Sequence, residues 1–291
     1  MIKKFISILA MMLLLVVLIT PSSAVYEKST SFQSGSITSE TIETTPSTPS
    51  YDNLLQIKNN LHVSSGTIEI NTFVTNGPIK VSAFSGLVTS AITTNHGVSI
   101  SEISAIKGPI HREVTTFVEK RFDYSIVPND LPNLGDFSTN KVQVISSSGQ
   151  YNNMNVLTPL TIDTTKQDVI LVINHLNLNS DIEVIGKHRA IFIVKSNLNI
   201  NGHRSINYHS KHSNFDLVVQ AWSLNVQNNI SFYGQLYFEG AYLYLRNNIE
   251  VYGAIFAPNA IVELSASTLY GALNCDSLTL LQNSLIAAKK N

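Results

Sequence analysis

The sequence has one cysteine and few charged residues. Without a second cysteine the chain cannot form an internal disulfide, and we expect Cys275 to be a small packed side chain. Charged residues make up 13% of the chain and the formal net charge is −1. That charge is too weak to attract nucleic acid or acidic lipid. No second long apolar run follows the N-terminal one, so we expect no membrane span once a signal segment is removed.

The first 24 residues have the features of a cleavable bacterial signal peptide. Lys3 and Lys4 precede an apolar run from Phe5 to Ile19, and small residues follow up to Ala24. This run is shorter than the roughly 20 residues that cross a bilayer, which favours cleavage over a retained anchor. We therefore expect a bacterial protein that is secreted or associated with the cell surface.

A Ser/Thr/Pro-rich segment follows the signal peptide. Residues 25–50 contain 13 Ser or Thr residues together with Pro46 and Pro49, and they have few apolar side chains. Such a composition predicts a disordered linker.

The remaining chain is repetitive. Residues 223–234 match 242–253 at a shift of 19, and 75–82 match 94–101 at the same shift. Apolar residues alternate within each unit, which predicts short strands with one buried face and bends at Asn or Gly. Because one such unit cannot bury its own face, the units must stack. Asparagines crowd the bends, and we expect them to form hydrogen-bonded ladders between coils.

The predicted fold is therefore all-β: a parallel β-helix, or solenoid, with coils of about 18–26 residues. An N-terminal block at 51–121 and a C-terminal block at 151–291 carry the repeats. Residues 122–150, with Pro128 and Pro132, form a crossing segment that packs across or joins the blocks. The irregular coil lengths favour right-handed coiling.

The C-terminal end suggests self-assembly. Ser277–Leu280 begins a further, incomplete turn, and 278–286 contains no clear capping helix. Unless residues 281–290 form a short amphipathic cap, we therefore expect an open strand edge at this end, through which copies could stack end to end. A charge introduced at Leu280 should then prevent stacking.

The stretch Tyr252–Leu264, followed by Leu269–Leu273, reads YGAIFAPNAIVEL and then LYGAL. It resembles the "YGAIYAPNA" signature of bacterial exported β-solenoid domains found in pilus-assembly-associated and other cell-surface proteins, which are distantly bactofilin-like. The resemblance loosely covers residues 65–285. It implies a solenoid and a surface setting, and it brings no catalytic residues.

A tyrosine column is the main candidate binding feature. Tyr233, Tyr252 and Tyr270 each precede a repeat glycine, so coils should align them. They could contact a glycan, as could Trp222, or they could pack as a structural stack. Ile185, which we place at the equivalent upstream position, favours packing.

Neither a metal nor another cofactor is predicted. The pair His209 and His212 could offer two imidazoles, but basic residues adjoin it and no acid does, so we expect a solvated basic loop.

Three functions follow from these patterns. The first is a non-enzymatic structural or adhesive cell-surface protein, possible partners being other copies or envelope polysaccharide. The second is a glycan-binding module that uses loops and the tyrosine column. The third is a polysaccharide lyase or glycosidase, but the acids Glu183, Glu239, Glu250, Glu263 and Asp276 are scattered and no Gly-x-Ser-x-Gly occurs.

Overall fold

A computed structural model describes residues 54–70, 72–81, 87–88, 92–94, 98–100, 110–111, 117–208 and 214–288. All of them belong to one compact unit, Thr48–Asn291. The predicted signal peptide at 1–24 and linker at 25–50 lie outside the described residues. No helix within the described ranges is long and apolar enough to cross a membrane.

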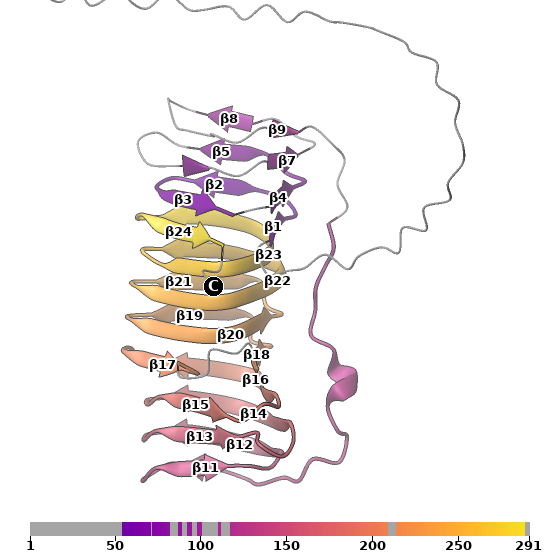
Figure 1. The fold of residues 1–291 in the computed structure, drawn as a ribbon, viewed down its shortest axis with the longest axis vertical. Coiled ribbons are helices and arrows are strands. Elements are labelled where there is room, and N and C mark those ends of the chain that lie inside the picture. The colour runs from indigo at the N-terminus through magenta and orange to yellow at the C-terminus, as the bar shows by residue number, and fades with distance from the viewer. Residues whose placement is uncertain are drawn as a thin grey trace, which may run out of the picture. The chain divides into compact units, whose positions relative to one another are not determined.

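The prediction of an all-β parallel solenoid is confirmed (Figure 1). Strand pairings are parallel throughout, and they form three ladders that we call faces A, B and C. Face A contains β2 (Leu61–Val63), β5 (Ile79–Val81), β8 (Val98–Ile100), β10 (Phe137–Ser138), β19 (Ser223–Gln227) and β21 (Tyr242–Arg246). Face B contains β3 (Gly66–Glu69), β6 (Leu87–Val88), β11 (Gln143–Ile145), β13 (Leu160–Asp163), β15 (Ile182–Ile185), β17 (Arg204–Ile206) and β24 (Ser284–Ala287). Face C contains β1 (Leu54–Ile57), β4 (Thr72–Thr75), β7 (Ile92–Thr94), β9 (Ile110–His111) and β18 (Phe215–Val219).

Longer strands turn the corners between faces. Three strands run from face C to face A: β12 (Gly149–Val156), β14 (Val169–Leu178) and β16 (Ala190–Ile200). One strand, β20 (Ile230–Phe238), runs from face B to face C, and β22 (Ile249–Ser265) and β23 (Thr268–Leu281) cover all three faces. The corner between faces B and C in β22 lies at Gly253, where φ is 151°.

The predicted repeats match the observed register. Ile230 pairs with Ile249 at a shift of 19, and Ser205 pairs with Ser231 at a shift of 26. Alternate side chains point inward and form one continuous hydrophobic core, which includes Cys275 at 0% exposure. The apolar alternation of the sequence therefore marks the interior of the coils.

The predicted asparagine ladders are present. Asn248 Nδ2 donates to Asn229 Oδ1 at 2.7 Å, and Asn177 Nδ2 donates to Asn155 Oδ1 at 2.8 Å. Asn228, Asn229, Asn247 and Asn248 all adopt positive φ angles between 58° and 69°. Asparagine tolerates this left-handed conformation better than most residues do, so it replaces glycine at these bends.

The order of the coils in the stack differs from their order in the sequence. The C-terminal strands do not form an open end, so that expectation is wrong: Leu278 pairs with Leu61, and Ser284 pairs with Gly66. The turn that begins at Ser277 is completed by β24. Leu280 is fully buried opposite Val63, so a charge there would disrupt the core and would not test end-to-end stacking.

We call the contact between residues 54–69 and 273–288 the seam. Lys58 N donates to Cys275 O at 3.0 Å, and Leu278 N donates to Asn60 O at 2.9 Å. The coils on its two sides are not consecutive in the chain, yet they continue the same three ladders (Figure 1). The last described strand, β24, therefore lies inside the stack, between β23 and β3.

Residues 117–135, which we call the strap, run along face C from the seam to the β10–β11 end (Figure 1). The strap includes a short 3-10 helix, η2 (Tyr124–Ile126). At the seam, Val118 O accepts a hydrogen bond from Asn274 Nδ2 at 2.9 Å. At the other end, Leu134 N donates to Gln150 O at 2.8 Å. The predicted crossing segment, 122–150, thus comprises most of the strap together with β10, β11 and the first residues of β12.

The strap covers a second hydrophobic cluster on the outer side of face C. Phe122 contacts Tyr237 edge to face, with ring centroids 5.4 Å apart. The cluster consists of Phe122, Leu131, Ile170, Val172, Ile191, Ile193, Val218, Tyr237 and Phe256. The strands of face C that the strap covers are therefore buried on both sides, which explains the continuous apolar runs at 169–173 and 190–194.

Candidate functional site

The three predicted tyrosines form a continuous stack on the outer side of face B. The rings of Tyr233 and Tyr252 are 4.4 Å apart at 4°, and those of Tyr252 and Tyr270 are 4.9 Å apart at 20°. Parallel pairing places them there, because Tyr233 pairs with Tyr252 and Tyr252 with Tyr270.

This stack covers the ring faces of its inner members. Tyr252 has a neighbouring ring on each side, so its edge and its hydroxyl remain for contact with a ligand. The hydroxyl donates to Glu250 Oε2 at 3.0 Å. Burial raises the pKa of Tyr252, and the nearby Glu250 carboxylate raises it further. The middle of the column is therefore neutral and well packed.

Tyr208 extends the column in a different orientation. Its ring meets Tyr233 edge to face, with centroids 5.3 Å apart at 81°. The side chain is 55% exposed. Of these four aromatic rings, Tyr208 is thus the one that offers the largest open surface.

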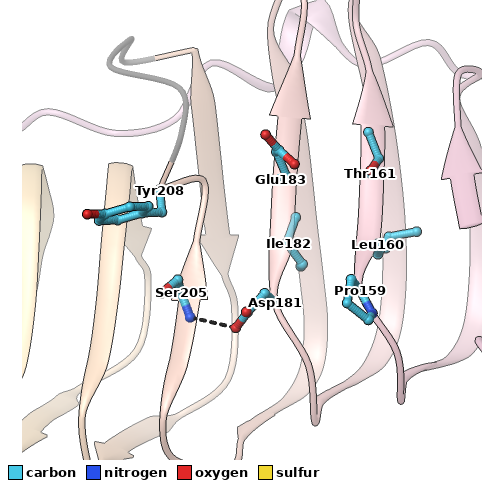
Figure 2. Close-up of a pocket in the computed structure, with 8 residues that line it drawn as sticks. All are labelled: Pro159, Leu160, Thr161, Asp181, Ile182, Glu183, Ser205 and Tyr208. Carbon is cyan, nitrogen blue, oxygen red and sulfur yellow. Dashed lines mark hydrogen bonds between the residues drawn. The ribbon is translucent and has the colours of Figure 1, made fainter. Parts of the chain in front are cut away.

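Beside Tyr208 lies a concave, open pocket of about 270 Å³, which we call the groove (Figure 2). It is formed where face B passes from β13 to β15 and β17. The lining residues are Pro159, Leu160, Thr161, Asp181, Ile182, Glu183, Ser205 and Tyr208.

The carboxylates of Asp181 and Glu183 and the hydroxyls of Thr161, Ser205 and Tyr208 give the groove its chemistry. Asp181 directly precedes β15 and Glu183 is the second residue of that strand, so the two flank Ile182 and their side chains point outward (Figure 2). Asp181 Oδ1 accepts a hydrogen bond from Ser205 N at 2.8 Å, which fixes this carboxylate. None of the eight lining residues is Lys, Arg or His. The groove is therefore negatively charged and polar.

Glu183 has no hydrogen-bond or ion-pair partner among the described residues. Several other acids on the solenoid wall are paired: Glu263 with Arg246 at 2.8 Å, Glu250 with Tyr252, and Asp163 with Thr165 N. The Thr161 and Ser205 hydroxyls likewise make no hydrogen bond within the described part of the chain. These groups are free to bind a ligand.

The register corrects the position that we assigned to Ile185. Ile182 pairs with Ile206, and Ile206 pairs with Phe232. The residue in line with Tyr233 is therefore Glu183, two positions before Ile185. The groove thus lies in line with the tyrosine column, with the polar side chain of Glu183 at the position that a tyrosine ring occupies in the later coils.

Trp222 lies apart from the column, at the start of face A. Its ring is 74% exposed and contacts Tyr242 edge to face at 6.2 Å. The structure does not bring it together with Tyr233, Tyr252 and Tyr270.

The two histidines that we considered as metal ligands, His209 and His212, lie outside the described residues. His188 Nδ1 is 3.8 Å from Asp168 Oδ1. Within the described ranges, no group of three or more His, Cys, Asp or Glu residues is placed to hold a metal ion.

Sequence reasoning missed the groove. Its signal is the triplet Asp181-Ile182-Glu183, whose alternation on a strand predicts two outward carboxylates side by side. The second signal is Tyr208 at the start of a long insertion, close to the column in space but not in the repeat.

Comparisons with known proteins identify a family. The family described as a domain of unknown function (DUF7305) matches residues 93–288, which is more than half of the chain. No curated protein matches the chain, and no solved structure matches it. The chain therefore belongs to the DUF7305 family of domains of unknown function.

Proposed function

We propose that this protein is a non-catalytic adhesive protein of the bacterial cell surface that binds a neutral glycan in the groove. The observation that carries the proposal is the position of a half-exposed ring, Tyr208, beside the unpaired carboxylate of Glu183 in a concave pocket. The export signal expected at 1–24 and the resemblance of Tyr252–Leu264 to exported surface solenoids support the surface setting.

The groove fits the chemistry of sugar hydroxyls. Carboxylates such as Glu183 accept hydrogen bonds from hydroxyl groups, and the Thr161 and Ser205 hydroxyls both donate and accept. The exposed ring of Tyr208 offers an apolar face for the C–H side of a sugar. Two carboxylates without a cation among the lining residues would repel uronate or sulfate groups. These features favour a neutral polysaccharide over an anionic one.

The arrangement of the acids favours binding over hydrolysis. Glycosidases place two carboxyl groups on opposite sides of the scissile bond. Asp181, directly before β15, and Glu183, within it, point in the same direction, and their Cα atoms are about 7 Å apart by strand geometry. Asp181 is also held by Ser205 N. The two carboxylates are thus suited to accept hydrogen bonds from neighbouring hydroxyls on one side of a polysaccharide chain.

Retention on polysaccharide resins tests the proposal. We expect the protein to be retarded by a neutral glucan resin and to pass through a polyuronate resin. Tyr208→Ala and Glu183→Leu should each abolish the retardation. No retention of the parent protein on any neutral glycan would overturn the proposal, and so would retention that survives both substitutions.

Two controls separate binding from folding and from catalysis. Tyr244→Ala removes a face A tyrosine outside the groove and should leave retention unchanged. Release of reducing ends from the retained polysaccharide, lost in Asp181→Asn or Glu183→Gln, would make the protein an enzyme instead. We expect no such release.

A further inference from the structure

One of the two ends of the stack that have free strand edges among the described strands is the β10–β11 end. β10 pairs with β12 and β11 pairs with β13, and neither has a second neighbour among the described strands. Their outer N–H and C=O groups form an open edge, which is a template for another strand. The strap reaches this end but occupies the face C side, where Asn133 bridges Gln150.

Exposed aliphatic side chains gather at the same end. Val142 is 67% exposed, Val144 61% and Leu157 53%. Among the described residues these are the large aliphatic side chains with more than half of their surface exposed; the aromatic residues with such exposure are Tyr208 and Trp222. From 137 to 156 the sequence has one charged residue, Lys141, so charges do little to protect the edge.

We propose that two copies of this chain join end to end through their β10–β11 edges. The seam shows that coils that are not consecutive in the chain can dock through their strand edges: β1, β2 and β3 continue the ladders of β23 and β24 in parallel. The open edge at β10–β11 likewise offers unpaired backbone groups to a second molecule, but two identical edges related by a two-fold axis pair antiparallel. The proposal does not depend on glycan binding.

The three residues of β11 define the contact. Val144 is the central residue and points outward, in register with Thr161 of the next coil. A two-fold axis through Val144 pairs the strand antiparallel with its copy, so that Gln143 faces Ile145 of the second copy. Val144 of one copy then packs against Val144 of the other, and the dimer covers the exposed aliphatic side chains at this end. Such a closed contact is self-complementary and ends at the dimer.

Cysteine crosslinking tests this geometry. Directly opposed residues of antiparallel strands have Cα atoms about 4.5–5.5 Å apart, which falls in the disulfide range. We expect Val144→Cys to form a disulfide-linked dimer on mild oxidation. Ile261→Cys, an exposed aliphatic position on face A within the stack, is the matched control and should stay monomeric. The native Cys275 is fully buried and should not interfere.

Sedimentation velocity across a concentration series completes the test. The parent protein should be in a monomer–dimer equilibrium, and Val144→Lys should remain a monomer with unchanged circular dichroism. A parent protein that is monomeric up to millimolar concentration would overturn the proposal. Filaments formed by a Val144→Cys variant that does not crosslink would also overturn it, because they require contact between opposite ends.

Discussion

Asn274 Nδ2 donates a hydrogen bond of 2.9 Å to Gln56 Oε1, joining two buried residues 218 positions apart across the seam. The same amide donates to Val118 O of the strap at 2.9 Å. Three segments of the chain, the N-terminal coils, the C-terminal coil and the strap, therefore meet at one side chain. This position couples the seam to the strap.

The first prediction concerns this junction. Asn274→Ala leaves the buried Gln56 Oε1 and the part-buried Val118 O without their donor, and we expect the free energy of unfolding to fall by about 1–3 kcal/mol. Asn174→Ala, which removes an exposed ladder bond of 3.1 Å to Asn152, should cost less than about 0.5 kcal/mol. Urea denaturation followed by tyrosine fluorescence measures both. Equal losses would show that Asn274 has no special role.

The strap should contribute to stability through its buried ring. Phe122 is 7% exposed within the second cluster. Phe122→Ala should lower the free energy of unfolding by about 3–5 kcal/mol, because it leaves a cavity beside Tyr237. Val118→Ala changes an exposed strap side chain and should be nearly neutral. If thermal denaturation found Phe122→Ala as stable as the parent, the strap would not be packed as described.

The glycines that follow the stacked tyrosines, Gly234, Gly253 and Gly271, should not tolerate a side chain. A Cβ at Gly253 would overlap the carbonyl oxygen of Gly234 in the adjacent coil, and φ there is 151°. We expect Gly253→Ala to destabilise the protein by more than about 2 kcal/mol, since backbone of the adjacent coil must move. At Gly135 φ is 70° but nothing lies within 4 Å of a Cβ, so Gly135→Ala should cost about 1 kcal/mol. Comparable melting temperatures for the two variants would contradict the close approach of Gly253 to Gly234 in the adjacent coil.

Alkaline pH should weaken the strap contact. Burial, with a smaller contribution from the Asp216 carboxylate, raises the pKa of Tyr237 to about 12, whereas an unfolded tyrosine titrates near 10. The unfolded state then loses its proton first, so the contribution of Tyr237 is present below about pH 10 and is lost as pH rises toward 12. Urea midpoints between about pH 9 and 11.5 should fall less steeply for Tyr237→Phe than for the parent. Parallel slopes would exclude this contribution.

Most of the coil architecture could be predicted from the sequence. Alternating apolar residues predict the strands and their buried face, and Asn228, Asn247 and Gly253 predict the bends. Each coil repeats these two requirements, a buried strand face and a tight bend. The seam could not be predicted from the repeat. Leu61 and Leu278 have the same pattern as residues that pair with the next coil in sequence, so the pattern fixes which face is buried but not which coil is adjacent.

The candidate site was predicted in part. The alignment of Tyr233, Tyr252 and Tyr270 follows from their spacing. Stacking of their rings was one of the two arrangements that this spacing predicted. Tyr208 lies in an insertion whose path no periodicity describes. The groove depends on that path, because β17 has just three residues and leaves β15 open beside Tyr208.

Crosslinking across the seam tests the order of the coils in the stack most directly. His62 and Thr279 pair on neighbouring strands, β2 and β23, although they are far apart in the sequence. We expect the double variant His62→Cys, Thr279→Cys to form an intramolecular disulfide that speeds migration in a non-reducing gel. The pair His62→Cys, Tyr244→Cys, on the same face but in coils that do not pair, should not react. If cysteines at 62 and 279 did not crosslink, the pairing of β2 with β23 would be contradicted. Rapid crosslinking would confirm that the N-terminal coils cover the C-terminal coil.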